Sequence, residues 1–139
     1  MDKPREEIKQ IGHGSLHLIS SVEEEFRSEG RTLSLDTKLL WFKIAHLDKD
    51  KKIIEGKAVT FEFPPYVWLV ADFLSSALKD LLERTYMKSI GMGNSDVEVI
   101  RLDEGIFIKK GDQSVEIPPE DIVELIDKLG FISAISKVR

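Results

Sequence analysis

An aromatic and basic segment in the first half of the chain holds the residue types that bind nucleotides. Trp41, Phe42 and Lys43 are consecutive, and Lys57 follows within the same segment. Indole and phenyl rings stack on unpaired bases, and lysine ammonium groups neutralise phosphates. Residues 31–60 carry seven positive and four negative charges, although the whole chain has a net charge of −5. The segment therefore predicts nucleic-acid binding that depends on stacking more than on charge.

Two further features extend this predicted site along the chain. Trp68 falls off the apolar stripe of the helix that follows the segment, and Lys79 shares its side. The competing interpretation is that large aromatic side chains such as Phe61 simply build the core. The candidate nucleic-acid-binding residues are Trp41, Phe42, Lys43, Lys57, Phe61, Trp68 and Lys79.

Other residues that could do chemistry lack the partners that chemistry needs. His13 and His17 have metal-ligand spacing on a helix, but a third ligand would have to be Glu24 or His46, and two histidines alone do not define a site. The loop at 91–93 has no following Gly-Lys-Ser/Thr motif. The chain contains no cysteine, which excludes disulfides and a thiolate nucleophile. We therefore expect no catalysis, no metal and no cofactor.

The apolar pattern predicts an α+β fold with a small antiparallel sheet. A helical segment is expected over 4–29, capped at Gly30, from apolar residues at three-, four- and seven-residue spacings. A hairpin over 37–63 turns at Asp48–Lys51 and places Trp41 and Lys43 opposite Ala58 and Gly56. A Pro-Pro pair and an amphipathic helix follow, and a second β unit, Pro-Pro pair and helix repeat that succession.

The predicted order is therefore αββαββα, two hairpin units with helices packed on one face. One domain is expected over 1–139, with the α+β core at 35–130 and a short carboxy-terminal tail that lacks heptads. Strand 39–47 has apolar residues on both sides. One side can be core, and the other must meet a ligand or a second protein surface.

The composition also predicts the temperature and the compartment in which the protein works. Asparagine and glutamine total three, beside many lysines and glutamates, which is typical of hyperthermophile proteins. The longest apolar run, 66–71, is too short to span a bilayer, and no amino-terminal signal is present. We expect a cytoplasmic protein without a membrane partner.

The Trp-Phe-Lys strand, the Phe-Glu-Phe-Pro-Pro-Tyr-Val-Trp junction at 61–68 and the long helix after it resemble the archaeal ThermoDBP-like single-stranded DNA-binding proteins. The resemblance covers residues 35–130 in element order. It implies homo-oligomers, with aromatic side chains flooring a cleft and lysines at its rim. The stacking floor would comprise Trp41, Phe42, Phe61 and Trp68, and the rim Lys43, Lys57 and Lys79.

Three hypotheses follow from these observations. The leading one is sequence-tolerant binding of single-stranded DNA, or of RNA, by base stacking in an aromatic cleft. The alternative is a structural homo-oligomer or adaptor whose apolar hairpin face is a protein interface. A small-molecule binder or enzyme in the cleft is the third, with no catalytic constellation to support it.

Overall fold

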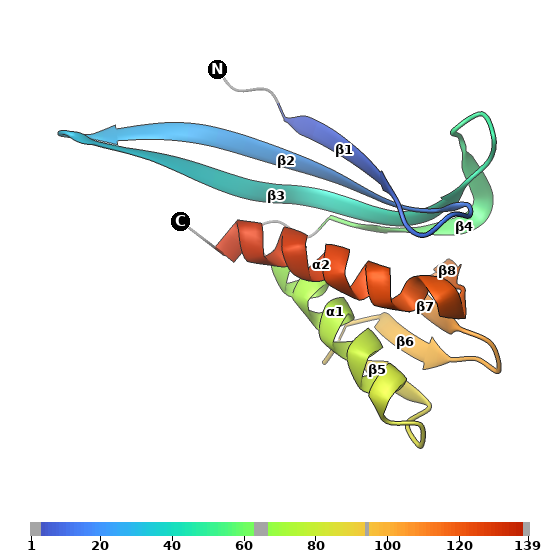
Figure 1. Ribbon diagram of the computed structural model, residues 1–139. Helices are drawn as coiled ribbons and strands as arrows, with labels where there is room; N and C mark the ends of the chain where they lie inside the picture. Colours follow the sequence, from blue (N-terminus) through green and yellow to red (C-terminus); the bar gives the residue numbers. More distant parts are fainter. Residues whose placement is uncertain (1–3, 63–66, 94, 138–139) are drawn as a thin grey trace.

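The computed structural model describes residues 4–62, 67–93 and 95–137, and within them the chain forms one antiparallel sheet and two helices (Figure 1). The strands are β1 (Arg5–Gln10), β2 (Leu16–Glu29), β3 (Thr32–Leu47), β4 (Ile53–Phe61), β5 (Ser89–Gly91), β6 (Val97–Arg101), β7 (Ile106–Lys110) and β8 (Gln113–Ile117). The helices are α1 (Val67–Glu83) and α2 (Ile122–Lys137), the latter preceded by a 3-10 turn, η1 (Pro119–Asp121). The eight-stranded sheet has the order β1-β2-β3-β4-β8-β7-β6-β5.

The predicted αββαββα order is wrong, because the sheet is larger than expected and begins the chain. The observed order is four strands and a helix, repeated once. The expected succession of β unit, Pro-Pro and helix is present in both halves, although the first Pro-Pro pair lies outside the described residues. The two halves meet where β4 pairs with β8 through Ala58 and Ser114. Antiparallel pairing was correctly predicted, and the number of strands was not.

Residues 4–29 are strands β1 and β2, and not the predicted helix. Every residue from 16 to 22 is buried, so this part of β2 is covered on both faces and shows no alternation of buried and exposed positions. The helical spacing was a coincidence produced by two strands and the turn between them. Gly12 and Gly30 have φ values of 69° and 63° and lie in strand connections, which explains why glycine occurs there.

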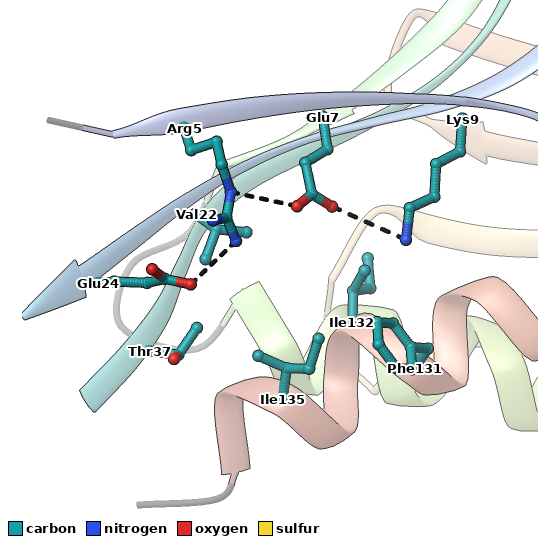
Figure 2. Close-up of a pocket in the computed structure, with 9 residues that line it drawn as sticks. All are labelled: Arg5, Glu7, Lys9, Val22, Glu24, Thr37, Phe131, Ile132 and Ile135. Carbon is teal, nitrogen blue, oxygen red and sulfur yellow. Dashed lines mark hydrogen bonds and ion pairs between the residues drawn. The ribbon is translucent and has the colours of Figure 1, made fainter. Parts of the chain in front are cut away.

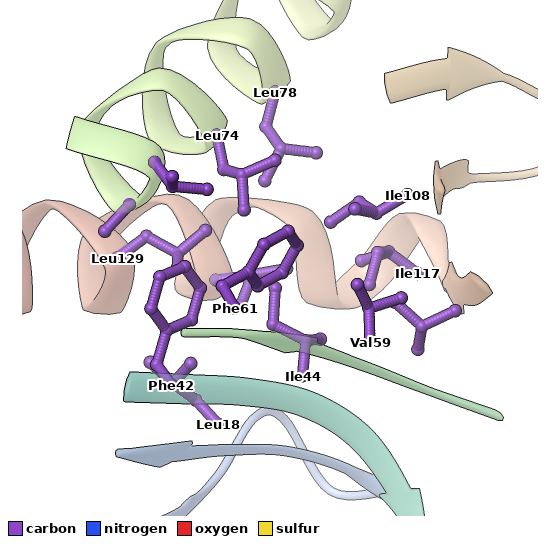
Figure 3. Packing of buried hydrophobic residues seen from close by; sticks show 14 of the residues in the cluster. Leu18, Phe42, Ile44, Val59, Phe61, Leu74, Leu78, Ile108, Ile117 and Leu129 are labelled. Atoms are coloured by element: carbon purple, nitrogen blue, oxygen red, sulfur yellow. The ribbon is translucent and has the colours of Figure 1, made fainter. Parts of the chain in front are cut away.

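Both helices lie on the same side of strands β1–β4, between those strands and the second half of the sheet (Figure 1). The main core fills this space. Phe42, Ile44 and Phe61 of the sheet meet Leu74 and Leu78 of α1, and all five are fully buried (Figure 3). The rings of Phe42 and Phe61 stack, with centroids 4.8 Å apart. The helices therefore cover one face of the first four strands and leave the other without a helical layer.

The predicted hairpin at 37–63 is confirmed as β3 and β4, but its register differs. Ala45 pairs with Ala58, where Ile54 was expected. The connection is longer by one residue, since Leu47 pairs with Ile53, and the ladder is irregular between Ala45 and Leu47. Gly56 has a φ of 78° and absorbs extra residues in β4.

The helix after the first β unit is confirmed as α1, whose apolar face is buried. The last helix extends beyond the predicted core at 35–130, because α2 continues through Gly130 to Lys137 and includes most of the expected tail. Gly130 lies against α1, where a Cβ atom would come 3.5 Å from the Ser75 hydroxyl. That distance is ordinary van der Waals contact, so the packing of the two helices does not require glycine at this position.

Candidate nucleic-acid interface

The face of the sheet opposite the helices, called here the outer face, carries a row of small side chains. Cross-strand partners share a face of a sheet. Successive partners on β2, β3, β4, β8 and β7 are His17, Ala45, Ala58, Ser114 and Lys109. The row thus crosses the junction between the two halves of the sheet. The row is buried at His17 and Ala45 and becomes accessible from Ala58 onwards, so an extended ligand could contact its second half.

Trp41 stands beside this row on β3 and has a lysine above its ring. The half-buried indole packs with Ala58 against a small apolar cluster of Ile19, Ala45 and Leu47. The Nζ atom of Lys43 lies 5.6 Å from the centroid of the Trp41 ring. This second cluster is separate from the main core, so β3 is apolar on both faces, as its sequence predicts. The indole ring can stack on a base, and the neighbouring ammonium group can contact the phosphate of that nucleotide.

A cavity of about 320 Å³ opens at the other end of the row, where β4 separates from β8. Phe107, Lys57 and Ser114 line it, together with Ser15 and His46. The sequence prediction included Lys57 but missed Phe107, which is half-buried on β7. Phe107 lies in an alternating strand, Ile106–Lys110, and that alternation was the signal that places it on the face opposite Ile106 and Ile108.

His46 ties the two halves of the sheet together at this cavity. Its Nε2 atom lies 2.7 Å from the carbonyl oxygen of Glu116 on β8, and its Nδ1 atom lies 2.7 Å from Oγ of Ser15. A carbonyl oxygen only accepts hydrogen bonds, so Nε2 carries a proton. In the neutral ring, Nδ1 then accepts a hydrogen bond from the Ser15 hydroxyl. The two hydrogen bonds position the junction together with Gln113 and Lys110, whose side chains hydrogen-bond to the backbone of Thr60 on β4.

The structure divides the predicted site residues between three places. Trp41 and Lys43 lie on the outer face, and the exposed Lys57 lines the cavity beside it. Phe42 and Phe61 were predicted wrongly as stacking residues, because both are 0% exposed and face the helices. Their alternation with Trp41 along the hairpin could not by itself tell which face the helices cover.

Trp68 and Lys79 belong to α1, on the other side of the sheet from Trp41. The side of α1 that carries Trp68 also carries Asp72 and Ser75. Ser75 Oγ donates a hydrogen bond to the carbonyl oxygen of Ile126, and Asp72 accepts one from Ser133 Oγ, so this side meets α2. The deviation of Trp68 from the apolar stripe thus reflects a polar helix–helix contact. Trp68 is half-buried and Lys79 is exposed, and neither converges with the outer face.

An acidic cavity of about 560 Å³ lies next to His46, between the β1–β2 turn and η1. Asp121 is only 4% exposed there. Burial raises the pKa of this carboxyl above its ordinary value, and Glu120 and Glu124 raise it further, while His46 and His13 oppose the shift. Gly12 donates its backbone N–H to Glu124 and has no room for a Cβ atom, which would collide with Asp121.

Asp121 makes the protein less stable as the pH rises. Its pKa is higher in the folded than in the unfolded chain, so the folded state binds more protons in the interval between the two values. The stability that the folded state gains by binding this proton is fully present below the unfolded pKa, about 4. It is lost as the pH rises through the folded pKa. In urea unfolding from pH 3.5 to 7, Asp121→Asn is expected to gain stability relative to the wild type as the pH rises. A constant difference between the two proteins would contradict this.

The described residues include no group of three histidine, aspartate or glutamate side chains placed to hold a metal ion. In particular, the predicted pair of His13 and His17 does not share a helix face. His13 is exposed in the β1–β2 turn, whereas His17 is buried on β2, with its Nδ1 atom 2.7 Å from the Ser15 carbonyl oxygen. Neither described helix is long and apolar enough to cross a membrane.

Comparison with known proteins finds a distant structural likeness. No family model and no curated protein matches the chain. Among solved structures, the chain is similar to one described as the plant transcriptional regulator PBF-2, with a TM-score of 0.46 and 13% sequence identity. The alignment covers 97% of this chain and 90% of that one. A likeness this distant supports no conclusion about function.

Proposed function

We propose that this chain binds single-stranded DNA without sequence preference on the outer face of its sheet, and that it catalyses no reaction. The observation that carries the proposal is Trp41 with the Lys43 ammonium group over its ring, beside the row of small side chains. Bases stack on Trp41, and the strand then crosses Ala58 and Ser114 towards Phe107. Lys57 and Lys109 neutralise phosphates along this path.

The proposed site omits four residues that the sequence favoured. Phe42 and Phe61 are in the core, and Trp68 and Lys79 lie on the helical side. The resemblance to ThermoDBP-like proteins therefore stays a prediction, and the present site does not depend on it. Duplex DNA is a poor ligand for this face, because its bases are already stacked and offer no ring to Trp41.

Tryptophan fluorescence tests the proposal directly, because the chain has two tryptophans. In Trp68→Phe, Trp41 is the sole reporter. We expect saturable quenching by a single-stranded oligothymidine and none by a duplex of equal length. A single-stranded RNA of the same length measures the preference between the two nucleic acids. Absence of quenching by every single strand, in a variant with a wild-type circular dichroism spectrum, would overturn the proposal.

The salt dependence of that binding is expected to be shallow. If Lys43, Lys57 and Lys109 each neutralise one phosphate, the logarithm of the association constant falls by about 2 per tenfold increase in salt. Lys43→Gln should reduce that slope by about 0.7. Lys79→Gln, on the exposed side of α1, is the matched control and should leave the slope unchanged. Equal slopes for both variants and the wild type would remove Lys43 from the site.

A further inference from the structure

Residues 23–38 form a two-stranded ribbon, called here the arm, that extends beyond the rest of the molecule (Figure 1). Pairing with β1 ends at Arg5 and Val22, and pairing with β4 ends at Phe42 and Phe61. Within the described residues, 23–29 therefore pair only with 32–38. Two-stranded ribbons are marginally stable alone in water, so an arm of this length needs something to pack against.

The arm has an apolar face with nothing described over it. Phe26 and Leu33 are 63% and 70% exposed. The Cα partner of Phe26 is Leu35, two residues from Leu33, so Phe26 and Leu33 lie on one face of the ribbon. Alternation along β2 places Val22 of the main core on that same face. The apolar surface of the core thus continues along the arm past the end of the helical layer.

A wedge beside the base of the arm is apolar too (Figure 2). It is a cavity of about 370 Å³ between β1, the arm and the second half of α2, floored by Val22, Phe131, Ile132 and Ile135. Phe131 is 54% exposed, with Lys9 Nζ 4.9 Å from its ring centroid. Each molecule therefore presents both a projecting apolar face and an open apolar wedge.

We propose that the occupant of the wedge is the arm of a second copy of this chain. Phe26 and Leu33 of one copy pack on Phe131 and Ile135 of the other, and the same contact is made in the opposite direction. Such a reciprocal contact is the isologous arrangement of a two-fold dimer. The contact between arm and wedge forms twice in each dimer, so the buried area is doubled. This brings it towards the ~800 Å² per partner of a stable interface.

Charge favours a second copy over a nucleic acid at this surface. The arm, residues 23–38, contains five acidic and three basic residues, and its net negative charge repels a polyanion. The rim of the wedge is balanced: Arg5 pairs with Glu7 and Glu24 at 3.2 and 2.9 Å, and Lys9 pairs with Glu7 at 3.7 Å. A rim without excess negative charge accepts an acidic arm. The outer face, on the other side of the sheet, stays free in the dimer.

The mass of the protein in solution tests the dimer. Light scattering after size exclusion should give twice the 15.8 kDa of the chain. Phe26→Ser with Leu33→Ser should give the monomer mass with an unchanged circular dichroism spectrum. The control replaces Tyr86 and Val123, which are 77% and 58% exposed, by serine and should stay dimeric. A monomeric wild type, or an arm variant that keeps the wild-type mass, would overturn the proposal.

Cross-linking tests whether the arm lies on the wedge of the other copy. Because the sequence contains no cysteine, only the introduced thiols can form a disulfide. Phe26→Cys protein is mixed with Phe131→Cys protein and oxidised. We expect a disulfide heterodimer formed faster than either homodimer, because each wedge receives the other copy's arm. Phe26→Cys mixed with Tyr86→Cys is the matched control and should give little product. Equal yields from the two mixtures would contradict the arrangement, whether or not the protein binds DNA.

Discussion

Replacing Phe42 by alanine is expected to lower the free energy of unfolding by about 3–5 kcal/mol. The ring is 0% exposed and stacks on Phe61, in the core that the sheet and helices share. Removing it loses the burial of the ring and leaves a cavity that the helices cannot fill without moving. A domain of this size has about 5–15 kcal/mol of stability in total, so the loss is a large fraction of it.

Urea unfolding followed by circular dichroism measures this change. Tyr86→Ala is the control, because Tyr86 is 77% exposed and its loss should cost no more than about 0.5 kcal/mol. Phe42→Leu keeps most of the apolar volume and should retain oligonucleotide affinity, since no base reaches this position. A Phe42→Ala protein as stable as Tyr86→Ala would place the ring outside the core and reopen its assignment as a stacking residue.

The contrast between Phe42 and its neighbour shows what the sequence could predict. Strand 39–47 was recognised because it is apolar on both sides, and the structure has a cluster on each face of β3. Which face the helices cover depends on contacts between residues far apart in the chain, which no local pattern records. A bulge where Ser21 and Val22 pair with Trp41 and Leu39 further changes the alternation, so Leu39 joins Phe42 in the core.

The amino-terminal strands were missed for a related reason. Residues 16–22 are buried on both faces, so the period of two that marks an exposed strand is absent, and apolar residues fell at helical spacings by chance. Helix α1 was predicted correctly because one side of it packs against the sheet and produces a regular apolar stripe. The half-buried Phe107 was overlooked because its strand is short and its importance arises only from the cavity beside β4.

Replacing Trp41 by alanine is expected to weaken binding of single-stranded DNA by about 5- to 150-fold without unfolding the protein. This range corresponds to the ~1–3 kcal/mol that stacking of one base on an aromatic side chain contributes. The indole is half-buried and packs on the small outer cluster, not on the main core. Its loss should therefore affect the ligand far more than the fold, the opposite of Phe42→Ala.

Two variants separate stacking from a general effect of the substitution. Trp41→Phe retains a ring and should recover most of the affinity that alanine loses. Trp68→Phe changes the other tryptophan, on the helical side, and should bind as the wild type does. Affinities from fluorescence anisotropy of a labelled single strand, at one fixed salt concentration, decide the matter. If Trp68→Phe binds more weakly while Trp41→Ala does not, the bases lie on the helical side and the outer face is not the site.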